Sequence, residues 1–213
     1  MFKCLYSSEI CHIIKNLIKM KSLKTAQKQI FTLLLFVLGF SVTFSQNSKL
    51  ISAESKMTVD GTSNLHDWTI TAKAMSGKAD FTVENGVLKD VNSLDFAVDV
   101  DQLKSGKDGM DENTMKAMNA KVYKNVTFKM TKLVKITKTS DGYTVDTQGT
   151  LSMAGSSKTI NQTFAVKLVG KKVVLSGKQK IDMTLYGIKP PKALFGTIKT
   201  GKDVTVDFKV TFD

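Results

Sequence analysis

The chain has 213 residues, with 31 basic and 19 acidic side chains and a formal net charge of +12. Every basic residue is Lys, and Arg is absent. Bidentate recognition of phosphates and guanine edges is mostly the work of Arg, whereas Lys is a hydrated point charge. The composition therefore argues against a sequence-reading nucleic-acid binder. The length allows one domain, or at most two small ones.

An apolar run near the start has the pattern of a secretory signal. Residues 30–44 are apolar apart from a few small polar residues, three lysines precede them within residues 21–28, and small residues stand at Thr43 and Ser45. The run is 15 residues long, shorter than the ~20 that span a bilayer as a helix. We predict a signal peptide over residues 1–45, cleaved after Ser45, in a periplasmic or secreted protein. An uncleaved anchor is the alternative.

The first part of this segment is unusual. Residues 1–19 make the basic segment before the apolar run unusually long, and Met20 would be an ordinary first residue. We therefore interpret residues 1–19 as the result of a mis-assigned translation start. Both cysteines, Cys4 and Cys11, lie there. Removal of residues 1–45 leaves 25 Lys, 18 acidic residues, a net charge of +7, one His and no Cys. Stability must then come from a hydrophobic core, for which residues 46–213 are long enough.

Alternation of apolar and polar residues dominates residues 46–213. It is clearest in residues 204–212, where Val and Phe alternate with Thr, Asp and Lys. This period of two is typical of a strand with one buried face. Seven more segments show the same alternation, so eight strands are predicted in all. Their apolar positions fall at Met57 and Val59, Trp68–Ala74, Leu94–Val100, Val126–Met130, Tyr143–Met153, Ile160–Leu168, Val173–Leu185 and Val204–Phe212.

Turn residues separate these strands. Asn85-Gly86, Asp141-Gly142, Gly155-Ser156 and Gly170-Lys171 are short connections of the hairpin type. Short connections between successive strands favour an antiparallel meander, and closure of the sheet removes its exposed edges. The sequence therefore predicts one all-β domain over residues 46–213, an antiparallel barrel of about eight strands.

One segment has the spacing of a helix instead. In residues 110–122, Asp111 suits a helix N-cap, and Met115, Met118 and Val122 form one apolar stripe. Met110 is placed to close a hydrophobic staple with Met115. We predict a short helix that lies across one end of the barrel.

An eight-stranded barrel is either filled by its own side chains or hollow enough for one small ligand. Residues 46–213 hold eight Met, a flexible side chain common at adaptable binding surfaces. Gln162, Gln179 and Lys132 fall on the inward parity of their strands, where a polar group needs a partner. Met fills cores more often than it lines channels, and these polar residues also fit a rim or a bulge. The pattern alone predicts a barrel but does not decide whether its interior is filled or hollow.

Four groups of residues, in order along the chain, resemble the YceI-like family of exported bacterial proteins. The first is Gly61–Trp68 (GTSNLHDW), which is similar to the family's S-x-x-H-D-W start. The others are Met110-Asp111 with Met115 followed by Tyr123-x-x-Val126-x-Phe128, the hairpin 149–155 (GTLSMAG), and Tyr186–Pro191 followed by the alternating C-terminal strand. The resemblance covers about residues 50–213. Lys124 is a departure, since the family usually has Pro after that Tyr.

This resemblance implies a lipocalin-like barrel whose apolar interior holds a polyisoprenoid or another lipid-like chain. By strand parity, twelve inward side chains are then expected to form the ligand-binding wall. They are Trp68, Phe96, Val98, Phe128, Met130, Leu151, Met153, Phe164, Met183, Phe208, Gln162 and Gln179. The short His-Asp-Trp spacing belongs to a subgroup of the family, so the ligand need not be the best-known one.

Catalytic and metal-binding patterns are missing from residues 46–213. His66-Asp67 is the only His–carboxylate neighbour pair, and there is neither a Cys nucleophile nor a G-x-S-x-G elbow. If both lie on one strand, their side chains point to opposite faces. One His without Cys cannot build an ordinary zinc site. We expect no enzyme activity, metal or cofactor, and a structural or rim role for His66.

The sequence thus predicts an exported, non-enzymatic protein that sequesters or carries a long apolar molecule inside a β-barrel. We expect no nucleic-acid partner and no stable membrane span. Lys residues at outward positions, such as Lys129, Lys167 and Lys209, indicate a solvent-exposed face. The main alternative is a ligand-free structural or interaction module of the cell envelope, and the third is an enzyme acting through His66 and Asp67. Whether the barrel forms a homodimer stays open.

Overall fold

Period-two alternation builds nearly all of the structure. The computed structural model describes residues 43–193 and 196–213, and the predicted signal peptide lies outside these residues up to Val42. Its predicted cleavage point, after Ser45, falls within the first strand, β1 (Thr43–Lys49). Burial in β8 (Gly142–Met153) alternates without a fault from one end to the other, as expected for a strand with one face on the core.

The described residues form twelve strands, one α-helix and three short 3₁₀ turns. The other strands are β2 (Lys56–Ser63), β3 (Trp68–Ala72), β4 (Met75–Glu84), β5 (Val87–Asp99), β6 (Leu103–Lys104), β7 (Asn125–Thr139), β9 (Ser156–Val169), β10 (Lys172–Asp182), β11 (Lys192–Ala193) and β12 (Ile198–Phe212). The helix is α2 (Asp108–Ala117), and the turns are η1 (Ser52–Glu54), η2 (Val100–Gln102) and η3 (Met183–Tyr186).

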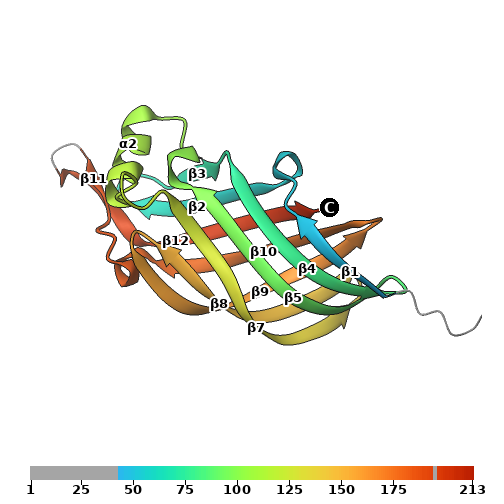
Figure 1. Cartoon of the computed structure of the whole chain (residues 1–213). Helices are drawn as coiled ribbons and strands as arrows, with labels where there is room; N and C mark the ends of the chain where they lie inside the picture. The colour runs from blue at the N-terminus through green and yellow to red at the C-terminus, as the bar shows by residue number, and fades with distance from the viewer. Residues whose placement is uncertain (1–42, 194–195) are drawn as a thin grey trace, which may run out of the picture. The chain divides into compact units, whose positions relative to one another are not determined.

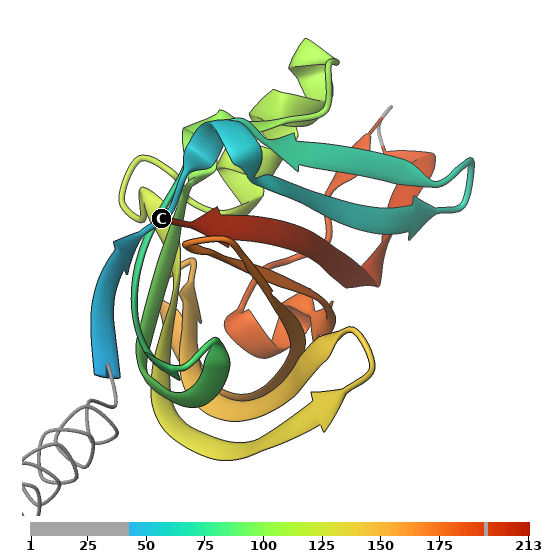
Figure 2. The ribbon, with the colours of Figure 1, turned by 90° about the vertical axis from the view of Figure 1, so that its right-hand side faces the viewer.

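Eleven strands form one curled antiparallel sheet, in the order β1-β4-β5-β7-β8-β9-β10-β12-β2-β3-β6, and β11 pairs with β12. The sheet bends round on itself as a half-barrel (Figures 1 and 2). The edge strand β1 approaches the interior strand β12, where Leu50, just after β1, bridges to Phe212 at the end of β12. Backbone bonds extend this contact, with Ile51 N donating to Thr211 O at 2.8 Å. Beside it, Asp213 N donates to Lys49 O at 3.1 Å.

The predicted fold class is confirmed, but the strand count was too low. The eight predicted strands correspond to β2, β3, β5, β7, β8, β9, β10 and β12. β1 was missed because it overlaps the predicted signal peptide. β4 was missed because Gly77 and Ala79 occupy inward positions of its alternating pattern, and small residues weaken a periodic apolar signal. β6 and β11 are only two residues long.

Three strands end earlier than predicted. β3 stops at Ala72, two residues before Ala74. Val100 begins the turn η2, and Met183 and Leu185 lie in η3 and not in a strand. At the end of β10 the carboxylate of Asp182 accepts a bond from Thr184 N at 2.9 Å. A side chain that bonds to the backbone two residues ahead favours a turn over a ladder, so β10 stops at Asp182.

The predicted helix exists, but its start was misplaced. Helix α2 begins at Asp108 after the cap residue Lys107, three residues before the predicted cap. Asp111 lies in the first turn and accepts two bonds from Ser105, at 2.7 Å from the backbone N and 2.5 Å from Oγ. It therefore fastens the preceding loop to the helix. Val122 lies beyond the helix and is exposed, so it does not belong to the apolar stripe.

The core consists of two clusters at opposite ends of the curled sheet. One, which we call the closed-end core, is built around Phe81, Val145, Val166, Val173 and Phe212, each at most 1% exposed. The rings of Phe81 and Phe212 meet edge to face, with centroids 5.8 Å apart, a favourable aromatic arrangement. The other cluster lies beneath α2 and surrounds the cavity described next.

Candidate functional site

The end of the sheet that carries α2 encloses an apolar cavity of about 570 Å³. Its floor is the top of the closed-end core, where Leu94, Leu175 and Phe212 line it. Its opposite end is lined by exposed residues that include Lys107 of the helix cap and Lys192 of β11. The cavity therefore opens to solvent beside α2 and is blocked at depth by packed side chains.

The structure places eleven of the twelve predicted wall residues on this cavity. They come from seven strands and from η3, and strand alternation turns them all to the same inner face. These residues are Trp68, Phe96, Val98, Phe128, Leu151, Met153, Phe164, Met183, Phe208, Gln162 and Gln179.

Met130 is the twelfth, and it does not line the cavity. It packs against the closed-end core instead. Met130 keeps the inward parity of Phe128 and differs only in the cluster that it contacts. The register between β7 and β8 shifts after it, between Met130 and Lys132, so β7 bulges there and parity does not carry across to Lys132. The bulge explains why Lys132, a polar residue on the predicted inward parity, is exposed.

Three aromatic rings of the wall lie over glycines of a neighbouring strand. A Cβ on Gly61 would fall 2.1 Å from the indole of Trp68, and one on Gly149 would fall 2.4 Å from the ring of Phe128. The ring of Phe208 covers Gly177 in the same way, at 2.9 Å. Glycine at these positions lets each ring pack directly against the neighbouring backbone. Each ring therefore lies along the wall, and a larger residue beneath it would push it into the cavity.

Two amides interrupt the apolar wall near the point where β9 and β10 cease to pair. Their ladder runs only from Lys172–Val169 to Ser176–Ala165. Three residues beyond it on each strand, Nε2 of Gln162 donates to Thr163 O at 2.7 Å and Nε2 of Gln179 donates to Lys180 O at 2.9 Å.

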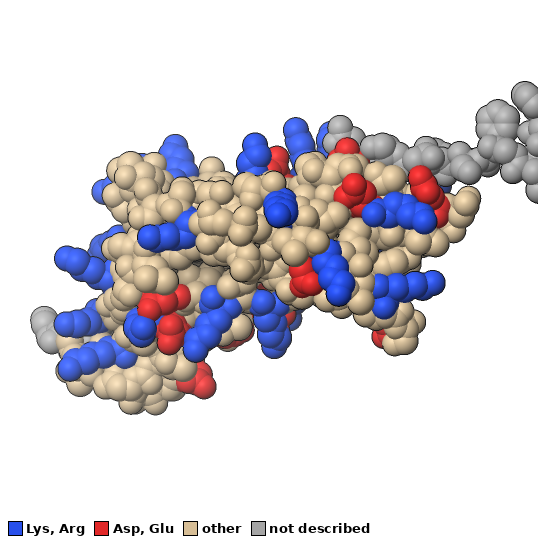
Figure 3. Space-filling view, turned by 90° about the horizontal axis from the view of Figure 1, so that it is seen from below, with Lys and Arg blue, Asp and Glu red and all other residues tan. Residues whose placement is uncertain are grey.

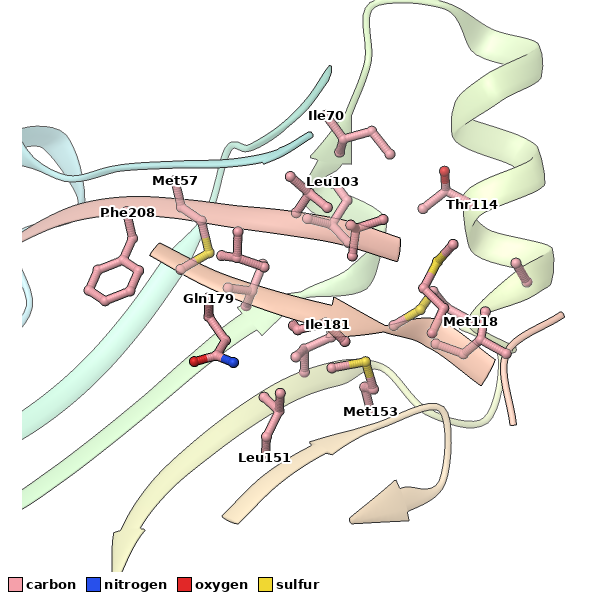
Figure 4. Close-up of a pocket in the computed structure, with 18 of the residues that line it drawn as sticks. Met57, Ile70, Leu103, Thr114, Met118, Leu151, Met153, Gln179, Ile181 and Phe208 are labelled. Carbon is pink, nitrogen blue, oxygen red and sulfur yellow. The ribbon is translucent and has the colours of Figure 1, made fainter. Parts of the chain in front are cut away.

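These amide bonds satisfy carbonyls in the unpaired stretch, as buried polar groups require. The side-chain carbonyl oxygens of Gln162 and Gln179 accept no bond from a described residue. Figure 4 shows the Gln179 amide directed into the cavity, with Leu151 and Met153 on the facing side. Each oxygen is placed to accept a hydrogen bond from a hydroxyl or amide of a bound molecule.

Helix α2 covers part of the opening. Met110 and Thr114 line the cavity from the helix, and Met118 lines it from the C-cap position. Thr114 faces inward in Figure 4. The two bonds from Ser105 hold the pKa of Asp111 below its ordinary value, outweighing the effect of burial. The Asp111 carboxylate is therefore charged at neutral pH, and it ties the helix to the loop at the cavity mouth.

His66 and Asp67 lie in the loop between β2 and β3. Ser63 organises this loop, since its Oγ donates to His66 O at 2.7 Å and accepts from His66 N at 3.1 Å. Nδ1 of His66 lies 2.7 Å from the backbone oxygen of Asp67, and no described bond joins the imidazole to its carboxylate. His66 is a residue of the cavity mouth, and its imidazole contacts the backbone of Asp67 rather than the carboxylate that would serve a catalytic pair.

Sequence reasoning missed several residues of the wall. Ile70 and Ile181 stand two positions from Trp68 and Met183, so strand parity could have identified both. The contributions of α2, together with Ile188 and Pro191 from the connection after β10, depend on how these segments fold over the opening. No periodic signal in the sequence predicts that placement.

Other kinds of site are not seen in the described part of the chain. Its His, Cys, Asp and Glu side chains form no group of three or more that could hold a metal ion. Its one α-helix is too short to cross a bilayer, and no other described helix is long and apolar enough.

A curled antiparallel sheet around an apolar cavity with one open end defines a lipocalin-like class of fold. Within it, this chain belongs to the YceI family, because the model of the YceI-like domain matches residues 40–212. No curated protein sequence matches the chain.

Solved structures show the same fold at low sequence identity. BcnA of Burkholderia cenocepacia is similar at a TM-score of 0.63 and 16% identity, over 76% of this chain and 98% of that one. A polyisoprenoid-binding domain of Saccharophagus degradans gives 0.61 and 14%, over 78% and 98%. The YceI protein of Campylobacter jejuni gives 0.51 and 20%, over 65% and 80%.

Proposed function

We propose that this protein binds one lipid-like molecule with a long apolar chain, of the polyisoprenoid type, in the cavity beneath α2. The observation that carries the proposal is the cavity itself, about 570 Å³ in volume and lined almost entirely by apolar side chains. That volume lies within the range of about 300–1,000 Å³ usual for small-ligand pockets. The polyisoprenoid-binding domain of Saccharophagus degradans, which shares the fold, supports this class of ligand.

Burial of the chain would drive binding. Each Å² of apolar ligand surface removed from water contributes roughly 25 cal/mol. Met57, Met118, Met153 and Met183 line the cavity, and their flexible thioethers adapt to a chain without a fixed shape. Gln162 and Gln179 offer carbonyl oxygens to a hydroxyl or amide of the ligand, and so would set its depth in the cavity.

In this proposal the protein sequesters or carries its ligand and does not transform it. The exposed loop geometry of His66 and Asp67 supports a binding role, since their side chains do not converge as an acid–base pair. We further propose that residues 1–45 direct export and are removed, which places the working protein in the periplasm or outside the cell. Mass spectrometry of the protein purified from the producing cell tests this, because cleavage after Ser45 gives a chain beginning at Gln46.

The direct test is organic extraction and native mass spectrometry of the purified protein. We expect a co-purified lipid, or, after delipidation, uptake of a prenyl alcohol such as geranylgeraniol. Two neighbouring substitutions make a matched pair. Leu151→Trp fills the cavity from β8, whereas Thr150→Trp adds the same ring on the outer face of that strand.

Only Leu151→Trp should abolish uptake, with both variants checked for folding by circular dichroism. Equal uptake by the two variants would contradict binding in this cavity. An empty protein that takes up no prenyl alcohol or other lipid would instead favour the ligand-free structural module.

A further inference from the structure

Large exposed apolar side chains gather around the mouth of the cavity. We define the rim as residues 64–67, 100–124, 183–193 and 196–199, the connections at the α2 end of the sheet (Figure 1). Of the six large apolar side chains that are exposed among the described residues, four belong to the rim, namely Leu65, Val122, Tyr123 and Leu185. Leu65, Val122 and Leu185 are 61–64% exposed.

These side chains come from three separate connections, so they are spread about the opening and do not form one strip. Single exposed apolar residues are normal on a soluble protein. Their concentration at one end, around an apolar cavity, indicates instead a surface that contacts an apolar phase. The remaining two, Val134 and Val169, lie towards the closed end of β7 and β9 and provide a comparison at 58% exposure each.

The rim also carries an excess of unpaired positive charge. Lys104 acts on the Asp111 carboxylate by its charge, and Lys116 is ion-paired. The other six lysines of the rim form no ion pair with a described residue, and they are Lys107, Lys121, Lys124, Lys189, Lys192 and Lys199. Among the rim's acidic residues, Asp111 is held by Ser105 and Glu112 is paired with Lys116. Asp67, Asp101 and Asp108 remain without an ion pair among the described residues. Lysines project from this end of the face shown in Figure 3, on its left.

One pair of rim lysines repels across neighbouring strands. Lys192 of β11 stands directly opposite Lys199 of β12 in the antiparallel ladder. Like charges in that position repel and destabilise the pair of strands. An anionic surface laid against the rim would relieve the repulsion, because it supplies counter-charge to both side chains.

We propose that the rim docks on the surface of an anionic lipid bilayer, with Leu65, Val122, Tyr123 and Leu185 entering the interface and the six lysines facing the lipid head groups. This partner combines the two chemistries that the rim offers, an apolar layer beneath negative charge. It goes beyond ligand binding, since it assigns a surface and a partner outside the cavity. In the docked state the cavity mouth faces the bilayer, so an apolar chain could pass between them without crossing water.

The test is co-sedimentation of the full chain with vesicles, either of phosphatidylcholine alone or of phosphatidylcholine mixed with phosphatidylglycerol. Wild type and variants share the same residues before Thr43, so any contribution of that segment cancels in the comparison. We expect binding to the mixed vesicles that weakens as salt is added. The triple variant Leu65→Ser, Val122→Ser, Leu185→Ser should bind at least about tenfold more weakly.

Two matched controls isolate the rim. The double variant Val134→Ser, Val169→Ser removes equally exposed apolar side chains away from the rim and should bind as wild type does. Lys192→Gln with Lys199→Gln should weaken binding to the mixed vesicles and reduce its salt dependence, whereas Lys135→Gln with Lys138→Gln, at exposed positions of β7 away from the rim, should have a smaller effect.

Equal binding by wild type and the rim variants would overturn the proposal, as would equal loss in the control variants. Failure of the wild type to bind any vesicle would also overturn it and would point to a protein partner for the rim. Native mass spectrometry of the same samples reports the ligand separately, because the serine substitutions lie at exposed positions outside the cavity wall. An empty cavity and a failed docking are therefore distinguishable.

Discussion

The closed end and the α2 end of the sheet are built from the same alternating strands, yet one is packed solid and the other encloses a cavity. At the closed end, large side chains such as Phe81 and Phe212 meet across the interior and are fully buried. At the α2 end, Trp68, Phe128 and Phe208 lie along the wall over glycines and leave the centre open. The packing partner of each aromatic ring, more than the number of apolar residues, therefore decides whether a barrel end is filled.

This contrast also separates stability from binding within one molecule. The closed-end core is close-packed, so shortening any of its side chains leaves a void. The wall of the cavity already borders empty volume, and a truncation there enlarges it at lower cost. We therefore expect the two ends to respond differently to the same substitution.

The largest expected effect comes from removing one Phe at each end. Phe81→Ala should lower the free energy of unfolding by about 3–5 kcal/mol, because a fully buried ring leaves a cavity in a packed core. Phe208→Ala, on the half-buried cavity wall, should cost about half as much or less. Urea denaturation followed by circular dichroism measures both. Equal losses would show that the α2 end is packed as tightly as the closed end.

A smaller effect is expected where a ring lies over glycine. Gly61→Ala places a methyl group against the indole of Trp68, and we expect a loss of about 1–3 kcal/mol from overpacking. Trp68 is the only Trp of the chain, so a shift in its fluorescence should report movement of the ring.

The matched control is Gly109→Ala in helix α2, where a Cβ meets nothing within 4 Å. This variant should be neutral or slightly more stable, since Ala favours a helix over Gly by up to about 1 kcal/mol. A similar loss in both variants would argue against close approach as the role of Gly61.

The smallest effect concerns the attachment of α2 over the cavity. Asp111→Asn weakens the two bonds from Ser105 and should cost about 1 kcal/mol at neutral pH. Because the pKa of Asp111 is lowered in the folded protein, its contribution is complete above the ordinary pKa of 3.8. That contribution is lost as the pH falls through the folded-state value.

The difference in stability between wild type and Asp111→Asn should therefore shrink as the pH falls below 3.8. Urea denaturation at a series of pH values measures it. A difference that stays constant into the acid range would mean that the carboxylate charge has no part in holding the loop.

The sequence predicted the strands and their inner faces where alternation is strict, and less where the backbone departs from it. β8 and β9 follow parity throughout their inner positions, so Leu151, Met153 and Phe164 were assigned to the correct face. Parity failed at Lys132, because β7 bulges between Met130 and Lys132, whereas Met130 keeps the inner face but packs against the closed-end core. A bulge depends on the pairing of two strands, and one strand's sequence does not reveal it.

The position of the cavity along the barrel could not be predicted for a related reason. The alternation that builds the hollow end also builds the packed end, since both require only an apolar inner face. The hollow end differs in having glycines, such as Gly61 and Gly177, beneath aromatic rings of the wall. The rings that cover them, of Trp68 and Phe208, are identified only once the cross-strand register is known. Likewise, the cover provided by α2 depends on the Ser105–Asp111 bonds, which join residues of a loop and a helix.

The place of β12 in the sheet has a consequence for how the protein acquires its structure. β12 is the last strand of the chain, yet it pairs with β10 on one side and with β2, the second strand, on the other. Its pairing with β2 closes a loop of nearly the whole domain, and contacts between such distant segments slow folding to milliseconds or longer. Until β12 is in place, β2 and β10 expose unpaired backbone and the inner face is open to water. Folding of this protein is therefore expected to be completed from its C-terminal strand, with the cavity among the last features to form.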